Sequence, residues 1–168
     1  NIPTVVDVLL NELNAQGHGL NLIVSGDAII PASWQAISDY CDAFQVKAIN
    51  AYGPAETTVN ASYAHIGEST MPVIGRPMQG HQIYVVDGNL NPVPIGAKGE
   101  IAIAGPGMAM AYLNREALYK EKFVANPFST EKGLETLYLS GDMGAYLPSG
   151  EVSFLGRKDR QVKVRGFR

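Results

Sequence analysis

A strand–helix–strand pattern within roughly 30 residues constrains the fold of this chain most strongly. The apolar run at 20–24 suits a buried parallel strand, and residues 46–51 form the next strand-like run. Between them, residues 31–44 begin with a proline and carry apolar side chains on one helical face. Ligands bind at the carboxyl ends of the strands in such a βαβ unit. The turns at 25–27 and 50–58 occupy these positions, so we expect a binding site there.

The remaining sequence predicts two more helices and a series of short strands. Residues 3–15 have apolar side chains at helical spacing. After about residue 68, the pattern predicts a helix at 115–123 and strands at 81–86, 100–104, 137–139, 144–147 and 151–155. Short strands separated by such turns are typical of a small antiparallel barrel or sheet. The predicted fold class is therefore α/β: the end of a doubly wound βαβ subdomain at 1–68, then a small antiparallel, β-barrel-like subdomain at 69–155.

Composition excludes several classes of protein. The 168 residues are 46% hydrophobic and 17% charged, which is ordinary for a globular protein. No run of 18 apolar residues is present, and residues 1–20 lack the basic start of a signal peptide. We therefore expect a cytoplasmic location and no membrane partner. The single cysteine, Cys41, cannot form an internal disulfide, and its place on the predicted helix indicates a buried thiol.

Charge is distributed unevenly along the chain. Residues 156–168 hold six Lys or Arg against one acid, Asp159, a local net charge of +5; since the total is −3, the rest carries −8. A basic segment is one signature of nucleic-acid binding. Here the basic residues alternate with Val162 and Val164 as in a strand, and no aromatic RNA-binding motif accompanies them. We therefore expect no nucleic-acid partner.

The turn at 50–58, Asn-Ala-Tyr-Gly-Pro-Ala-Glu-Thr-Thr, carries side chains suited to a nucleotide. Tyr52 offers a ring for stacking a base, Asn50 an amide for its edge, and Glu56 a carboxylate for Mg²⁺. The hydroxyls of Thr57 and Thr58 suit phosphate oxygens. From these residues alone, a polar turn after a buried strand is an equally good interpretation.

Three further segments, together with this turn, resemble the adenylation domains of non-ribosomal peptide synthetases, which belong to the acyl-adenylate-forming superfamily. Residues 99–113 begin Gly-Glu-Ile and end Ala-Tyr-Leu, close to the family's Gly-Glu-Leu to Gly-Tyr-Leu stretch. Residues 138–142, Tyr-Leu-Ser-Gly-Asp, are similar to its Tyr-Arg-Thr-Gly-Asp, and residues 156–166 to its Gly-Arg-x-Asp-x-Gln-Val-Lys-x-x-Gly. The four motifs follow the family's order and cover roughly residues 20–168.

The resemblance implies that an amino acid reacts with ATP to give an aminoacyl-adenylate, which is then loaded on a phosphopantetheine thiol. It assigns catalytic roles to Glu56, Thr57 and Arg157, with Glu56 also the Mg²⁺ ligand. The implied nucleotide contacts are Gly26, Asn50, Tyr52, Gly53, Asp142, Phe154 and Arg157. Each has a structural alternative, such as a core tyrosine, a turn carboxylate or a surface cation. Ala55 stands where the family usually has a hydroxyl residue that touches phosphate, and Thr57 is offset from that position.

For the amino-acid pocket, the resemblance implies Ile23, Ser25, Ala51, Val59 and Asn60. Small Ala51 and Ser25 beside apolar neighbours suit a mid-sized or aromatic side chain. Asp159 matches the family's hinge residue, so residues 156–168 are expected to form the hinge and the start of a small C-terminal domain.

The implied partners are an amino-acid substrate, a peptidyl carrier protein, an MbtH-like protein and the remainder of the adenylation domain. The family's phosphate loop and C-terminal lysine are not in these 168 residues, so we expect the chain alone to be inactive. The alternative is a non-catalytic remnant or interaction module that binds nucleotide weakly or docks to a partner. An exposed apolar edge would favour the enzyme, and a closed surface would favour the module.

Overall fold

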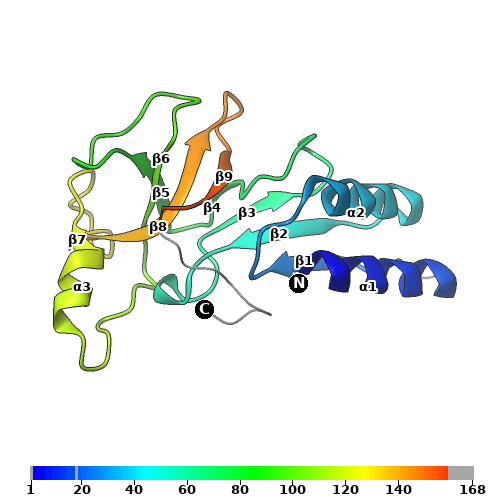
Figure 1. Cartoon of the computed structure of the whole chain (residues 1–168), viewed down its shortest axis with the longest axis horizontal. Helices are drawn as coiled ribbons and strands as arrows, with labels where there is room; N and C mark the ends of the chain where they lie inside the picture. Colours follow the sequence, from blue (N-terminus) through cyan, green and yellow to red (C-terminus); the bar gives the residue numbers. More distant parts are fainter. Residues whose placement is uncertain (1, 18, 159–168) are drawn as a thin grey trace.

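The computed structural model describes residues 2–17 and 19–158, which form two sheets and three α-helices (Figure 1). The first part contains α1 (Ile2–Gln16), β1 (Leu22–Ser25), α2 (Pro31–Phe44) and β2 (Ala48–Tyr52). A short 3-10 helix, η1 (Ala55–Thr57), precedes β3 (Ser62–His65) and β4 (Arg76–Pro77). The second part contains β5 (Gln82–Val86), β6 (Gly99–Ala104), α3 (Glu116–Lys122), β7 (Phe123–Ala125), β8 (Thr136–Tyr146) and β9 (Val152–Arg157).

The first sheet has the strand order β1-β2-β3-β4 and contains the predicted βαβ unit. Strands β1 and β2 are parallel, with Ile23 opposite Ile49 and Ser25 opposite Ala51, and β3 runs antiparallel to β2. Helices α1 and α2 pack on each other beside this sheet (Figure 1). Their buried side chains and those of the sheet form one core: Val6, Leu10, Leu13, Ile29, Trp34, Ile37, Tyr40, Cys41, Ala48, Ala64, Ile66 and Val73. The buried thiol expected at Cys41 is confirmed, and burial raises its pKa.

Strand β1 differs from the fully buried strand that its apolar run suggested. Leu22 and Val24 pack against the helical core, whereas Ile23 is 74% exposed on the opposite face. The reason is that β1 lies at the edge of the first sheet, and the two helices cover only one face of it. An unbroken apolar sequence therefore does not mean that both faces are covered within this chain.

The second sheet is antiparallel, with the order β5-β6-β8-β7, and β9 pairs with the second half of β8. The strands predicted at 137–139 and 144–147 are one eleven-residue strand, β8. This strand bends at Gly141, whose φ is +73°, and its register shifts against both β6 and β9 near the bend. The predicted helix at 115–123 ends one residue earlier, because Phe123 begins β7. Strands β3, β4 and β7 were not predicted.

A seam of backbone hydrogen bonds joins the two sheets at Gly75 and Val152. The amide of Val152 donates to Gly75 O at 2.8 Å, and the amide of Ile74 donates to Val152 O at 2.9 Å. The first sheet therefore reaches past residue 68, where the sequence suggested a boundary, and touches β9 directly. Among the described residues, no helix is long and apolar enough to cross a membrane.

Candidate functional site

A cavity of about 390 Å³ lies at the carboxyl ends of β1 and β2, where the βαβ pattern placed a ligand site. Both sheets contribute to its wall. The first supplies residues 26–29, 50–54 and 72–74, and the second supplies Asp142, Phe154, Gly156 and Arg157. Of the expected nucleotide contacts, all seven line this cavity: Gly26, Asn50, Tyr52, Gly53, Asp142, Phe154 and Arg157.

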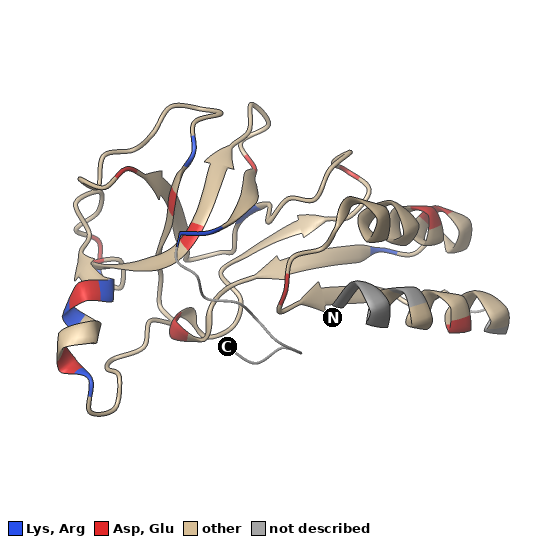
Figure 2. Cartoon of the chain, in the orientation of Figure 1, with Lys and Arg blue, Asp and Glu red and all other residues tan. Residues whose placement is uncertain are grey.

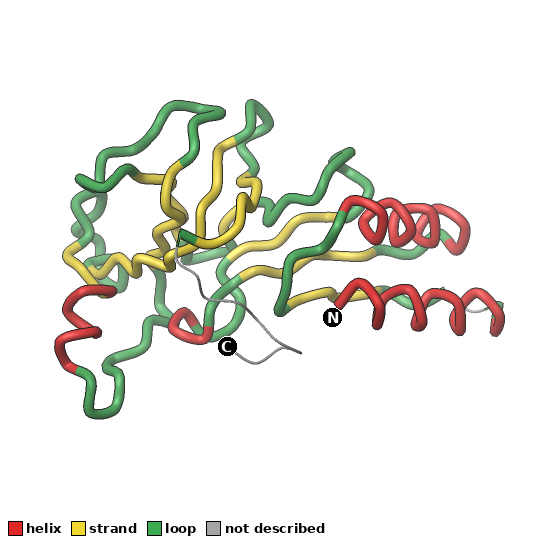
Figure 3. Tube along the Cα trace, viewed as in Figure 1, coloured by secondary structure: helices red, strands yellow, loops and turns green. Residues whose placement is uncertain are grey.

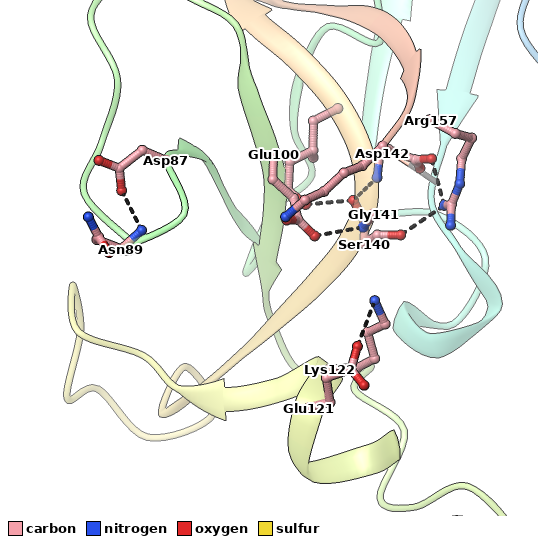
Figure 4. A network of polar contacts seen from close by, with 11 residues as sticks. Asp87, Asn89, Glu100, Glu121, Lys122, Ser140, Gly141, Asp142 and Arg157 are labelled. Carbon is pink, nitrogen blue, oxygen red and sulfur yellow. Dashed lines mark hydrogen bonds and ion pairs between the residues drawn. The ribbon is translucent and has the colours of Figure 1, made fainter. Parts of the chain in front are cut away.

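Asp142 is the centre of a polar network in the cavity wall (Figure 4). Its Oδ1 accepts a hydrogen bond from Arg157 Nη1 at 2.8 Å, as Figure 4 shows. Its Oδ2 accepts one from the Tyr52 hydroxyl at 2.6 Å. The same Arg157 nitrogen also donates to Ser140 O at 2.8 Å. An anionic acceptor strengthens such bonds, so the carboxylate is held in one orientation between a strand of each sheet.

Tyr52 keeps its proton in this setting. Burial, and then the negative charge of Asp142, raise the pKa of Tyr52 well above its ordinary value. The hydroxyl is therefore a hydrogen-bond donor throughout the neutral range. The ring lies 6.4 Å from Phe154, at an interplanar angle of 45°. The cavity thus has two aromatic rings beside one oriented carboxylate.

Hydrogen bonds from Ser140 and Gly141 stabilise the bend that precedes Asp142. Ser140 Oγ donates to Ile101 O at 2.6 Å and accepts from the Asp142 amide at 3.0 Å. The Gly141 amide donates to Glu100 Oε1 at 2.9 Å (Figure 4), and Lys158 Nζ lies 2.9 Å from Glu100 Oε2. Figure 2 shows acidic segments of β6 and β8 close to the basic end of β9. Sequence reasoning gave Glu100 no role. Its position in the Gly-Glu start of the 99–113 motif was the only available signal.

Asn50 and Gly53 are fixed by their backbone surroundings. Asn50 Nδ2 donates to Val73 O at 2.7 Å, which ties the end of β2 to the 72–74 segment. A Cβ atom at Gly53 would lie 2.5 Å from Val59 O, so the close approach of these two segments requires glycine here.

Glu56 and Thr57 lie beside the cavity and are not among its lining residues. Thr57 is fully buried and donates its hydroxyl to Pro54 O at 3.1 Å. Glu56 is 8% exposed, and its Oε1 accepts a hydrogen bond from the Tyr112 hydroxyl at 2.9 Å. Thr58 donates its hydroxyl to Gly107 O at 2.7 Å. Sequence reasoning gave no role to Tyr112, although it belongs to the 99–113 motif.

The five residues expected in the amino-acid pocket do not all lie at the cavity. Ala51 is buried and lines the cavity, and Ser25 is its half-buried neighbour on β1. Ile23 and Val59 are exposed. Asn60 Oδ1 is buried without a hydrogen-bond partner among the described residues. Asp159, the expected hinge residue, lies outside the described residues.

The donor set suits a magnesium ion that arrives with a nucleotide. No group of three or more His, Cys, Asp or Glu side chains in the described part of the chain could hold a metal by itself. Magnesium commonly binds through one or two carboxylates together with substrate phosphates and water. Glu56, two residues beyond the cavity-lining Pro54, can supply such a carboxylate.

Comparison with known proteins identifies the class of this chain. A family model described as "AMP-binding enzyme" matches residues 1–113. The chain is 39% identical to vanchrobactin synthetase VabF of Vibrio anguillarum and 41% identical to bacitracin synthase 3 of Bacillus licheniformis, in each case over 99% of its length. It spans only 6% and 2% of these two relatives.

Solved structures agree with this. PA1221, described as an NRPS protein with adenylation and PCP domains, superposes with a TM-score of 0.84 at 26% identity, over 99% of this chain and 33% of that one. An artificially fused adenylation–PCP di-domain from Klebsiella oxytoca gives 0.78 at 28% identity, over 99% and 30%. The chain belongs to the AMP-binding enzyme family, whose members are acyl-adenylate ligases that use ATP and Mg²⁺. Within that family it is part of an adenylation domain of the non-ribosomal peptide synthetase type.

Proposed function

We propose that this chain supplies the nucleotide cavity, and one wall of the amino-acid pocket, of a domain that activates an amino acid and loads it on a carrier protein. The observation that carries the proposal is the cavity in which Asp142, Tyr52 and Arg157 form one hydrogen-bond network beside the rings of Tyr52 and Phe154. An oriented carboxylate suits the hydroxyls of a sugar, and the rings suit the faces of a base.

In the proposed reaction, a carboxylate oxygen of the amino acid attacks the α-phosphorus of ATP. The new bond joins this oxygen to phosphorus, and the bond from the α-phosphorus to the bridging oxygen breaks, releasing pyrophosphate. The carrier's thiol sulfur then attacks the acyl carbon, loses its proton and displaces AMP. Magnesium, when bound, neutralises phosphate charge; in this chain Glu56 would hold it, and Asp142 and Tyr52 would orient the nucleoside.

The exposed face of the first sheet supports the enzyme over the non-catalytic module. Ile23 on the edge strand β1 and Tyr63 on β3 are exposed on the face opposite the two helices, and Ala51, which pairs with Ser25 and Tyr63, lies on the same face. Apolar side chains on a sheet face normally require a covering layer. We infer that further parts of the adenylation domain cover this face and complete the amino-acid pocket around Ser25 and Ala51.

The test is amino-acid-dependent exchange between ATP and pyrophosphate in the adenylation domain that contains this chain. Asp142→Ala should weaken ATP binding about tenfold or more, because it removes an anionic acceptor worth roughly 1.5–3 kcal/mol. Amino-acid binding should change little. A domain that binds ATP but shows no exchange with any amino acid would favour the binding module. Unchanged ATP affinity in Asp142→Ala would remove this network from the nucleotide site.

A further inference from the structure

The segment between β6 and α3 is fastened to the turn that carries Glu56. Figure 3 shows this loop running past η1. The Ala109 amide donates to Glu56 O at 2.8 Å, and the Thr58 hydroxyl donates to Gly107 O at 2.7 Å. A Cβ atom at Gly107 would lie 3.0 Å from Thr57 O, so the two backbones approach closely. The Tyr112 hydroxyl makes the third attachment, to Glu56 Oε1 at 2.9 Å.

Tyr112 reaches Glu56 from a firmly packed aromatic cluster. Its ring lies edge-on to Phe123, with centroids 5.9 Å apart. Phe123 is itself stacked on Tyr119 at 4.4 Å and packed against Tyr138 at 4.9 Å. Phe123 and Tyr138 are buried, so the cluster is rooted in β7 and β8 of the second sheet. The hydroxyl of Tyr112 is thereby presented from the second sheet to a carboxylate of the first.

Glu56 needs such a partner. Glu56 is only 8% exposed, and an ionised carboxylate removed from water is stable only when hydrogen bonds replace the lost hydration. A tyrosine hydroxyl bound to an ionised carboxylate makes a charge-assisted bond, which favours one side-chain orientation over the others. A carboxylate that approaches magnesium must have the right position, because this ion demands near-octahedral geometry.

We propose that Tyr112 is a positioning residue: its hydroxyl orients the Glu56 carboxylate toward the magnesium that accompanies ATP. This rests on the proposed function, since it takes Glu56 as a ligand of that ion. This role would also explain the tyrosine near the end of the 99–113 motif, because its hydroxyl links the second sheet to the turn that carries Glu56.

The experiment compares Tyr112→Phe with Tyr119→Phe in the adenylation domain that contains this chain. Tyr119 stacks on the same Phe123, and its hydroxyl makes no hydrogen bond to other described residues, so its substitution is a matched control. Calorimetry measures ATP affinity at saturating Mg²⁺ and again in EDTA. We expect Tyr112→Phe to weaken binding about tenfold with Mg²⁺ and to leave metal-free binding unchanged. Tyr119→Phe should change neither value.

Glu56→Gln separates this inference from the proposed function. If Glu56→Gln leaves Mg²⁺-dependent binding and pyrophosphate exchange unchanged, the role of Glu56 fails, and this inference with it. If Glu56→Gln weakens binding with Mg²⁺ and Tyr112→Phe does not, only the inference is overturned. The double variant gives the positive test: Tyr112→Phe should add nothing in the Glu56→Gln background. Additive losses, or equal losses with Mg²⁺ and in EDTA, would show that Tyr112 does not act through Glu56.

Discussion

The Tyr52 hydroxyl is the group in the cavity whose removal tests the site most directly. It donates to Asp142 Oδ2 at 2.6 Å, while Arg157 Nη1 holds Oδ1 at 2.8 Å. Each carboxylate oxygen accepts more than one hydrogen bond, so Asp142 can keep both partners and still accept from a sugar. Tyr52→Phe deletes only the hydroxyl and retains the ring beside Phe154. The substitution therefore separates orientation of the carboxylate from stacking.

The expected loss follows from the kind of bond. A hydrogen bond to a charged group contributes roughly 1.5–3 kcal/mol. Tyr52 is half-buried, so we take the lower end, about 1.5 kcal/mol, which corresponds to about a tenfold weaker Kd for ATP. The loss should fall mainly on nucleotides that have both ribose hydroxyls, because we propose that these hydroxyls bind the Asp142 carboxylate. With 2′-deoxy-ATP and 3′-deoxy-ATP, the same substitution should cost only about two- to threefold in Kd.

The assay is calorimetric titration of the three nucleotides into the adenylation domain that contains this chain. Tyr84→Phe is the control, because the Tyr84 hydroxyl donates to Gln82 within the second sheet and does not line the cavity. Tyr52→Phe should narrow the preference for ATP over its deoxy analogues, and Tyr84→Phe should leave that preference intact. An equal loss for all three nucleotides, or no loss for any of them, would refute the argument that Tyr52 acts through Asp142.

Three further outcomes test the seam, the pocket and the Tyr52 hydroxyl. Gly75→Ala should lower the free energy of unfolding by roughly 3 kcal/mol or more, and Gly133→Ala by about 1 kcal/mol. Both glycines have a positive φ, but only at Gly75 would the new Cβ atom meet backbone, 1.9 Å from Tyr63 O. Denaturant unfolding measures both, and equal losses would contradict the steric argument. Ala51→Leu should weaken amino-acid binding by about 1–3 kcal/mol and leave ATP binding unchanged; calorimetric titration of each ligand measures this. A larger effect on ATP binding than on amino-acid binding would contradict the place of Ala51 in the amino-acid pocket. The pKa of Tyr52 is raised in the folded state, so the native protein holds that proton more tightly than the unfolded chain does. The free energy of unfolding should therefore fall as the pH rises above about 10. In the Tyr52→Phe variant, Tm should fall less steeply over the same pH range.

The sequence predicted the fold where one local pattern decided the element. The helical spacing at 31–44 matches α2, and the apolar runs match β1 and β2, because packing on one core enforces the same periodicity that the sequence shows. Strand β3, with the sequence Ser-Tyr-Ala-His, is defined by its pairing with β2 and has no strong apolar pattern of its own. The single strand β8 was divided in the prediction because Gly141-Asp142 is typical of a turn, whereas in the fold it is a bend within continuous pairing.

Several residues of the candidate site were predictable from their own motifs, but the hydrogen bonds that join them were not. Asp142 was identified from its own motif, but Tyr52, its hydrogen-bond donor, is 90 residues away in the sequence. Glu56 and Tyr112 are 56 residues apart, and Gly141 and Glu100 are 41 apart. Periodicity and turn chemistry describe neighbours within a few residues, so contacts of this range appear only once the two sheets are placed.

The seam at Gly75 and Val152 connects the fold to the chemistry. Segment 72–74 leads into Gly75 and lines the cavity, while Val152 begins β9, whose later residues Phe154 and Arg157 also line it. The two parts of the chain are also linked by the hydrogen bond from Tyr52 to Asp142 and, outside the strands, by the one from Tyr112 to Glu56. A rotation of one sheet against the other would therefore separate Asp142 and Arg157 from Tyr52, and it would displace Glu56 at the same time. Because the proposed nucleotide contacts come from both sheets, bound ATP should rigidify the seam, and hydrogen exchange of the Val152 amide should slow when ATP is added. Equal exchange with and without ATP would mean that the cavity binds without engaging both sheets.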